Sequence, residues 1–197
     1  MARVVFIGAY AYAQAVLDAL PEPPVLVITN TIGAPRQEEI CWPDGSMYLD
    51  VAGHQLDIAP VLWAIEPDLV IVAGWRRLVP TGHEVTSWPT VGFHSAKLPE
   101  YPGRAPVANA ILRGDPTITN TMLWLEDGID SGDIIDEWEF PLTGRTPDDI
   151  YGEMGATSAA MLLRHWDGLL DGTAPRRKQD PSKRGPLTPA DAWERLP

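Results

Sequence analysis

The sequence predicts an α/β fold in which helices flank a mostly parallel, Rossmann-like sheet. Runs of consecutive β-branched and apolar residues recur at 3–8, 24–29 and 68–73, as in strands that a parallel sheet buries on both faces. Segments with the helical spacing of apolar residues separate them, at 12–20 and 58–65. No internal repeat is visible in the sequence, so a solenoid is not indicated.

The start of the chain is typical of a βαβ unit. The run 3–8 ends in Gly8, the segment 12–20 has one apolar helical face, and prolines separate this segment from the run 24–29. Such units are right-handed by the usual rule. The turn after Gly8 lacks the GxGxxG pattern of dinucleotide-binding folds, so we expect no dinucleotide site there.

The same patterns predict the later elements. In chain order, these are an edge strand at 46–49, a strand at 90–93 ending on His94, a short helix at 107–113, a strand at 117–125, an acidic loop at 126–133 and a half-exposed strand at 136–142. A long helix is expected after Thr146, because Thr is a good N-cap and Pro147 suits the first helical position. Gly172 is expected to end this helix.

Length and charge restrict the architecture and the partners. The 197 residues suit one domain with a full core, which we expect over 1–175, followed by a short C-terminal extension over 176–197. The net charge is −12, and basic residues gather only in the extension. An acidic surface repels phosphate backbones, so we expect no nucleic-acid partner.

The sequence also predicts a compartment. No apolar run approaches the ~20 residues of a membrane span, and the N-terminal residues continue as a strand where a signal peptide would have an apolar core. The single Cys41 excludes an internal disulfide framework. We therefore expect a cytoplasmic protein with no membrane partner, and the sequence leaves open whether the chain forms a homodimer.

One histidine and one acidic loop are the candidates for chemistry. His94 stands at the end of the predicted strand 90–93, and the acidic loop 126–133 follows the predicted strand 117–125. Ligands of open α/β sheets bind at the carboxyl ends of strands. A histidine and an aspartate that meet there make a proton-handling pair. The other histidines, His54, His83 and His165, are expected to lie outside the site.

The acidic loop also resembles a metal-binding loop in composition. Four carboxylates in this loop and just after it recur at every third residue, namely Asp127, Asp130, Asp133 and Asp136, with His94 available as a further ligand. The spacing lacks the EF-hand pattern, and Gly128 and Gly132 suit a tight turn. We therefore expect no metal, and a solvated loop of which only Asp130 faces inward.

The stretch from Thr90 to Ile135 resembles the folate-dependent formyltransferase family, which includes methionyl-tRNA, glycinamide-ribotide and nucleotide-sugar N-formyltransferases. Many positions at fixed spacing carry the resemblance, which makes it far more specific than a lone pair of residues. The matching residues are His94, Ser95, Leu98, Pro99, Tyr101, Gly103, Ala105, Pro106, Gly114, Asp115, Asp130, Ser131, Gly132, Asp133 and Ile134.

The resemblance implies the formyltransferase fold and a reaction. The family's catalytic His and Asp fall on His94 and Asp130. The implied activity is transfer of a formyl group from N10-formyltetrahydrofolate to the amine of a small acceptor: a nucleotide-linked amino sugar, an amino acid or a natural-product amine. His94 would donate to the developing oxyanion, and Asp130, directly or through water, would take the amine proton.

One position departs from the family pattern. The family's catalytic Asn lies two residues before the His, and Gly92 stands there in this chain. Removing one oxyanion donor costs about 3 kcal/mol, or roughly 10²–10³ in rate, in other enzymes. Gly92 therefore predicts a slow enzyme or a donor supplied from elsewhere, and the candidate donors are Asn120, which we include among the catalytic residues, and Asn109.

The resemblance also assigns the binding residues. The family has a similar Gly-Trp loop that lines the folate pocket, which here predicts folate contacts from Trp75, Arg76, Leu78, Val79, Glu126, Asp127, Gly128 and Ile129. An aromatic or apolar slot suits a pterin ring, although Trp75 would serve equally well as a packing residue. The acceptor is expected to meet Ser95, Tyr101, Gly103 and Arg104.

Two alternatives remain at this point. The same scaffold suits a formyl hydrolase or another acyl or one-carbon transferase, which would hand the group to water or use another donor. A non-catalytic family member that binds folate or a nucleotide is the second alternative. Turnover of the formyl donor, with and without candidate amines, separates them.

Overall fold

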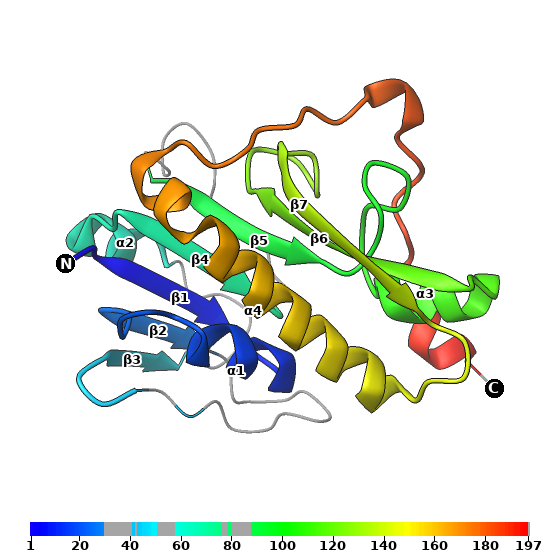
Figure 1. The fold of residues 1–197 in the computed structure, drawn as a ribbon, viewed down its shortest axis with the longest axis horizontal. Helices are drawn as coiled ribbons and strands as arrows, with labels where there is room; N and C mark the ends of the chain where they lie inside the picture. The colour runs from blue at the N-terminus through cyan, green and yellow to red at the C-terminus, as the bar shows by residue number, and fades with distance from the viewer. Residues whose placement is uncertain (30–40, 42, 51–57, 76–78, 80–87, 197) are drawn as a thin grey trace.

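The computed structural model describes residues 1–29, 41, 43–50, 58–75, 79 and 88–196 (Figure 1). In this part of the chain, seven strands form one sheet in the order β3-β2-β1-β4-β5-β6-β7. The strands are Val4–Gly8 (β1), Leu26–Thr29 (β2), Met47–Asp50 (β3), Leu69–Ala73 (β4), Thr90–His94 (β5), Thr117–Trp124 (β6) and Ile134–Pro141 (β7). The α/β class with a mostly parallel sheet, predicted from the sequence, is confirmed.

The sheet changes character at β5. The strands from β3 to β5 pair in parallel, whereas β5 pairs with β6, and β6 with β7, in antiparallel register. On β6, Thr121 lies opposite His94 and Trp124 lies opposite Val91. The carboxyl ends of β5 and β6 therefore lie at opposite ends of the strands in the sheet.

Helices cover both faces of the sheet (Figure 1). They are Ala11–Asp18 (α1), Ala59–Ile65 (α2), Pro106–Arg113 (α3) and Pro147–Asp171 (α4). One face packs on α1 and α4, in a core that includes Phe6, Ile71, Val91, Met122, Met161 and Leu162. The other face packs on α2, in a core that includes Val5, Ile7, Val70 and Leu62. The runs predicted as doubly buried strands owe their composition to this arrangement.

The predicted helix start at Thr146 takes the form of a capping box. The Thr146 hydroxyl accepts a hydrogen bond from the Asp149 backbone N–H at 3.2 Å, and the Asp149 carboxylate accepts one from the Thr146 N–H at 2.9 Å. Gly172, at φ 79°, ends α4 in the left-handed conformation. No helix in the described ranges is both long and apolar enough to cross a membrane.

The C-terminal residues run back across the molecule after α4 (Figure 1). They include two short 3-10 helices, Pro181–Lys183 (η1) and Ala190–Arg195 (η2), which the sequence did not predict. The segment makes isolated bridges from Arg177 to Ile134 and from Thr188 to Gly103. It thereby contacts both the start of β7 and the loop that follows β5.

Candidate functional site

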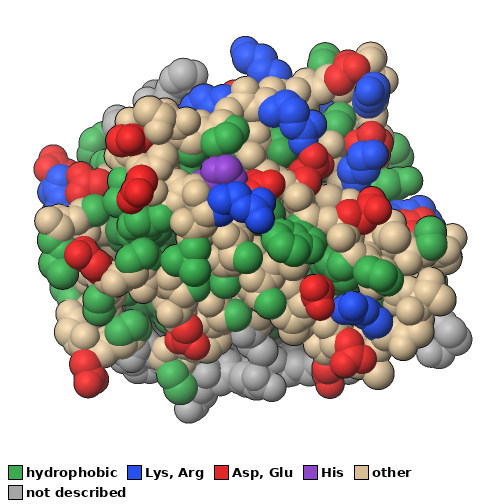
Figure 2. All heavy atoms as spheres, in the orientation of Figure 1, with side chains coloured by type: hydrophobic (Ala, Val, Ile, Leu, Met, Phe, Trp, Pro, Cys, Tyr) green, Lys and Arg blue, Asp and Glu red, His purple; other side chains and the backbone are tan. Residues whose placement is uncertain are grey.

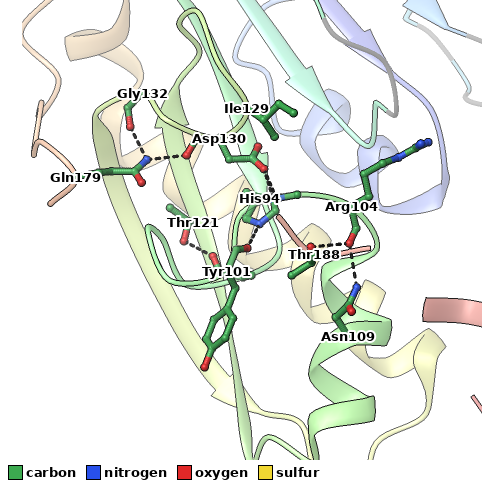
Figure 3. A network of polar contacts seen from close by, with 12 residues as sticks. His94, Tyr101, Arg104, Asn109, Thr121, Ile129, Asp130, Gly132, Gln179 and Thr188 are labelled. Carbon is green, nitrogen blue, oxygen red and sulfur yellow. Dashed lines mark hydrogen bonds and ion pairs between the residues drawn. The ribbon is translucent and has the colours of Figure 1, made fainter. Parts of the chain in front are cut away.

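His94 is buried at the carboxyl end of β5, with only 7% of its side chain exposed. Its Nε2 lies 2.8 Å from the Tyr101 carbonyl oxygen (Figure 3). A carbonyl can only accept, so Nε2 carries the hydrogen of this bond. Nδ1 faces Asp130 Oδ2 at 3.5 Å, which is longer than a direct hydrogen bond. The ring is therefore fixed through Nε2, and Nδ1 is directed toward the carboxylate.

Asp130 is held in an unusual backbone conformation. Its φ of 50° lies in the left-handed region, which residues other than glycine seldom adopt. Its Oδ2 accepts a hydrogen bond from the Gly103 backbone N–H at 2.8 Å. Gly103 itself has φ 115°, and a Cβ there would lie 2.5 Å from the Thr188 backbone nitrogen. Only glycine fits at this position, because both the backbone angle and the close approach exclude a side chain.

The loop before Asp130 folds back over the sheet. Because β6 runs antiparallel to β5, its carboxyl end lies beside Val91 and Thr90, where the Leu125 N–H donates to the Thr90 carbonyl at 2.7 Å. The chain then returns along β5 and brings Asp130 to His94. The sequence predicted that His94 and Asp130 meet because two strands have their carboxyl ends on the same side of the sheet. In the structure they meet because the loop after β6 returns to the end of β5.

Leu125 occupies the space beside Gly92. A Cβ built on Gly92 would lie 2.9 Å from Leu125 Cδ2 and 3.1 Å from its Cδ1. Leu125 also packs against Leu98, Leu123 and Ile134. The volume that a polar side chain at residue 92 would use is thus taken up by a leucine.

The structure does not bring Asn120 or Asn109 to His94. The Asn120 amide donates to the Met154 carbonyl and the Thr157 and Ser158 hydroxyls at 2.8–3.1 Å, all on α4. Side chains alternate along a strand, so Thr121, opposite His94, faces the other side of the sheet from Asn120. The Asn109 amide donates to the carbonyls of Arg104, Ala105 and Pro189. Both amides stabilise the fold, and the expectation that Asn120 supplies the missing donor is corrected by this placement.

The sequence profile of the formyl transferase family matches residues 3–164. The chain belongs to the formyl transferase family. It is similar to the methionyl-tRNA formyltransferase of Latilactobacillus sakei, with 25% identity over 198 residues that cover 91% of this chain and 61% of that protein. The enzyme of Acidobacterium capsulatum is 26% identical over 195 residues, covering 90% of this chain and 62% of that protein. The chain thus spans about three fifths of the length of these relatives.

Solved structures of other formyl transferases share the fold. An N-formyltransferase from Helicobacter canadensis, in complex with folinic acid and dTDP-3-aminofucose, superposes with a TM-score of 0.70 at 20% identity, covering 94% of this chain and 70% of that one. Glycinamide ribonucleotide transformylase 1 from Symbiobacterium toebii gives a TM-score of 0.69 at 23% identity, covering 91% of this chain and 93% of that one. At these identities the likeness concerns the architecture.

The residues that the formyl transferase resemblance assigns to folate belong to two segments, one after β4 and one after β6. Trp75, Val79 and Leu125 pack on the same apolar cluster, which the α2 face of the sheet forms. Residues 126–129 directly follow Leu125 and are exposed. Arg76 and Leu78 lie outside the described residues. Trp75 and Val79, which follow β4, and Leu125, which precedes the acidic loop and lies beside Gly92, therefore share one apolar cluster.

The residues assigned to the acceptor surround His94 unequally. Ser95 is buried directly after His94, and Gly103 contacts Asp130. In Figure 3 the Tyr101 ring points away from His94, and Arg113 lies over that ring at 4.0 Å. The Arg104 side chain is exposed and also extends away from the pair. Tyr101 therefore contributes its carbonyl to the pair, not its ring.

The regularly spaced carboxylates have different surroundings. Asp130 meets His94, whereas Asp136 lies on β7 and contacts Arg164 Nη1 at 2.8 Å and His165 Nε2 at 2.9 Å, both on α4. His165 thus has a carboxylate partner outside the candidate site. In the described ranges, no three His, Cys, Asp or Glu side chains are arranged to hold a metal ion.

Proposed function

We propose that this chain transfers the formyl group of N10-formyltetrahydrofolate to the amine of a small acceptor. The observation that carries the proposal is the buried His94–Asp130 pair, at 3.5 Å, in a chain of the formyl transferase family. The acceptor classes are a nucleotide-linked amino sugar, an amino acid and a natural-product amine. The complex of a structural relative with folinic acid and dTDP-3-aminofucose supports the first class.

Each side chain of the pair has a task in the proposed reaction. The amine attacks the formyl carbon, the carbonyl oxygen becomes an oxyanion, and the amine must lose a proton. Because the Tyr101 carbonyl engages His94 Nε2, Nδ1 is the nitrogen left to face the reacting centre, and it donates to the oxyanion when it carries a proton. Asp130 takes the amine proton, directly or through one water.

One oxygen of the Asp130 carboxylate is held in place, and the other is available for proton transfer. Oδ2 is fixed by the Gly103 N–H at 2.8 Å. Among the described residues, no hydrogen bond engages Oδ1, so this oxygen is the one left for the incoming amine or its water. The bond from Gly103 holds the carboxylate plane while the proton is transferred, and a fixed acceptor avoids reorganisation during the reaction.

The charge of the chain favours a small acceptor over tRNA. The net charge is −12, and Figure 2 shows acidic and basic side chains interspersed over the face that carries α4. Tight binding to a nucleic acid needs a surface that neutralises several phosphates. We propose therefore that no nucleic acid is a partner, although the sequence relatives are methionyl-tRNA formyltransferases.

A turnover assay tests the proposal. The purified chain is incubated with 10-formyltetrahydrofolate and separate amines, namely nucleotide-linked amino sugars, free amino acids and methionyl-tRNA. Tetrahydrofolate release and the formylated product are measured by absorbance and mass spectrometry. Amine-dependent release with a small acceptor is expected, and release that is equal without any amine would indicate a hydrolase. Formylation of methionyl-tRNA alone would contradict the proposed acceptor class.

A second candidate is a folate-binding family member without catalysis. The observation that favours it is Leu125, which fills the space beside Gly92 where the family's donor side chain would lie. Bound ligand raises the unfolding temperature by mass action, so thermal shift detects folate without turnover. A shift with 5-formyltetrahydrofolate, together with no turnover of the 10-formyl donor with any amine, would support this candidate.

A further inference from the structure

A segment far along the chain contacts both loops that build the candidate site. Residues 179–188, here called the strap, follow α4 and pass over the loop that carries Asp130 and then over the loop that carries Gly103 (Figure 1). The family profile ends at residue 164, before this segment. The contacts of the strap are made to main-chain atoms of the two loops.

Gln179 binds the Asp130 loop through its side-chain amide. Its Nε2 donates to the Asp130 carbonyl at 2.9 Å and to the Gly132 carbonyl at 2.8 Å (Figure 3). Both partners can only accept, so the orientation of the amide is determined by them. Its Oε1 is buried, and no hydrogen-bond partner for it occurs among the described residues. The polar end of Gln179 therefore acts through the two bonds that it donates to the loop.

Arg184 extends the same contact. Its Nη2 donates to the Ile129 carbonyl at 2.6 Å. Gln179 and Arg184 together thus bind the carbonyls on both sides of the Asp130 Cα. Asp130 has a φ of 50°, and such a conformation persists only where the surroundings hold it. The strap supplies donors at this strained position.

The far end of the strap fixes the residue that binds the Asp130 carboxylate. The Thr188 N–H donates to the Pro102 carbonyl at 2.7 Å, and its hydroxyl donates to the Arg104 carbonyl at 2.8 Å. Gly103 lies between these residues, and its N–H binds Asp130 Oδ2. One segment therefore determines where the carboxylate lies and where the donor that holds it lies.

We propose that the strap sets the geometry of the His94–Asp130 pair, and that Gln179 and Arg184 are positioning residues that act through the Asp130 main chain. The kinetic part of this inference rests on the proposed function. A displacement of about 1 Å at a reacting group can reduce a rate roughly 10²-fold, so small shifts of Asp130 are sufficient for a large effect. The alternative is a tail that only covers apolar surface.

Gln179→Met separates these two roles, because methionine keeps the size of the side chain and removes its donor. The kcat is expected to fall about 10- to 100-fold, with little change in KM for the folate, because the pair is misplaced while the apolar cluster with Trp75, Val79 and Leu125 is intact. Lys178→Met is the matched control, since Lys178 is an exposed neighbour. Equal kcat in the two variants would overturn the proposal.

Arg184 provides a second test in which the fold is less at risk, because this side chain is exposed. Arg184→Lys retains a donor, whereas Arg184→Met retains only the aliphatic part. The lysine variant is expected to keep more of the kcat than the methionine variant. Equal losses in both would show that the donated hydrogen bond to the loop is not what matters, and would contradict the proposal.

A spectroscopic measurement separates failure of this inference from failure of the proposed function. The ring ¹⁵N resonances of His94 are followed in histidine-labelled protein and assigned by their loss in His94→Ala. Gln179→Met is expected to shift them and Lys178→Met is not. If the wild type shows no turnover but the His94 resonances still shift in Gln179→Met and not in Lys178→Met, the positioning role of the strap is supported and the transferase function is refuted. If the wild type shows turnover but the resonances are the same in both variants, the positioning role of the strap is refuted.

Discussion

The part of the chain that the structure describes contains two histidine–aspartate pairs, and they differ in separation, in burial and in the elements that carry them. His94 and Asp130 lie 3.5 Å apart, on a strand end and a loop, with the histidine almost fully buried. His165 and Asp136 lie 2.9 Å apart, on α4 and β7, and each side chain is 17% exposed. The shorter pair joins a helix to a strand, and the longer pair joins the end of β5 to the loop between β6 and β7.

The difference between the pairs is in how many bonds the carboxylate already makes. Asp136 accepts from Arg164 and His165 through Oδ2 and from the Glu137 N–H through Oδ1. Asp130 accepts from Gly103 through Oδ2, beside His94. A carboxylate with both oxygens engaged stabilises the fold, whereas one with a free oxygen can accept a proton. The separation of a pair is therefore a poorer guide to chemistry than the remaining hydrogen-bonding capacity.

The largest contrast between the pairs should appear in activity. His94→Ala and Asp130→Asn are each expected to lower kcat/KM by about 10²–10⁴, the usual contribution of a positioned proton-transfer group. His165→Ala is expected to leave kcat/KM unchanged, because it lies on α4 with Asp136 as its partner. Steady-state kinetics with an accepted amine make the measurement. A loss in His165→Ala as large as that in His94→Ala would remove the distinction.

The next effect concerns the missing donor beside His94. Gly92→Asn alone is expected to lower kcat/KM or stability, because its Cβ would lie 2.9 Å from Leu125 Cδ2. Gly92→Asn combined with Leu125→Ala makes room on the face that His94 shares. The double variant is expected to raise kcat up to about 10²-fold over Leu125→Ala alone, by restoring an oxyanion donor. A slower double variant would mean that another group, or a water, already serves the oxyanion.

The structural pair should instead affect stability. Asp136→Asn removes the charge that binds Arg164 and His165, and it is expected to lower the free energy of unfolding by about 1.5–3 kcal/mol, the range for hydrogen bonds to charged groups. Urea denaturation measures this change. Asp167→Asn is a suitable control, because Asp167 is an exposed aspartate on the same helix. A full loss of activity in folded Asp136→Asn would contradict the structural role.

The smallest effect belongs to an exposed carboxylate at the start of α4. Hydrogen bonds from the Thr146 hydroxyl and N–H hold the pKa of Asp149 below its usual range. A group whose pKa is lowered on folding stabilises the protein above its unfolded pKa, and this contribution disappears as the pH falls through the folded pKa. The difference in Tm between wild type and Asp149→Asn should therefore be largest near neutral pH and vanish in acid. A difference independent of pH would contradict this assignment.

Local patterns in the sequence predicted most of the fold. Continuous apolar runs, one-sided helices and the Thr146 cap depend on neighbouring residues alone, so β1, β4 and α4 were predicted close to their observed bounds. The formyltransferase resemblance singled out His94 and Asp130, and the structure has them 3.5 Å apart. The fixed spacing of the motif made this possible, because a motif reports a shared arrangement that no single residue reveals.

Asn120 shows the limit of that reasoning. The sequence indicates a strand at this position but not which face each residue takes, and a shift of one residue reverses the face. The register with β5 directs Thr121 to the side of His94, so Asn120 faces α4. That register depends on long-range pairing and could not be inferred from a single strand.

The sequence by itself thus determined the class of fold, the elements and the residue types available at the site. The tertiary structure decided how they meet. Antiparallel pairing of β6 sends its carboxyl end away from His94, and the returning loop brings Asp130 back. The Gln179 contacts join residues 47 and 49 positions apart through main-chain carbonyls, which every residue has. These contacts therefore cannot be predicted from a pattern of side chains.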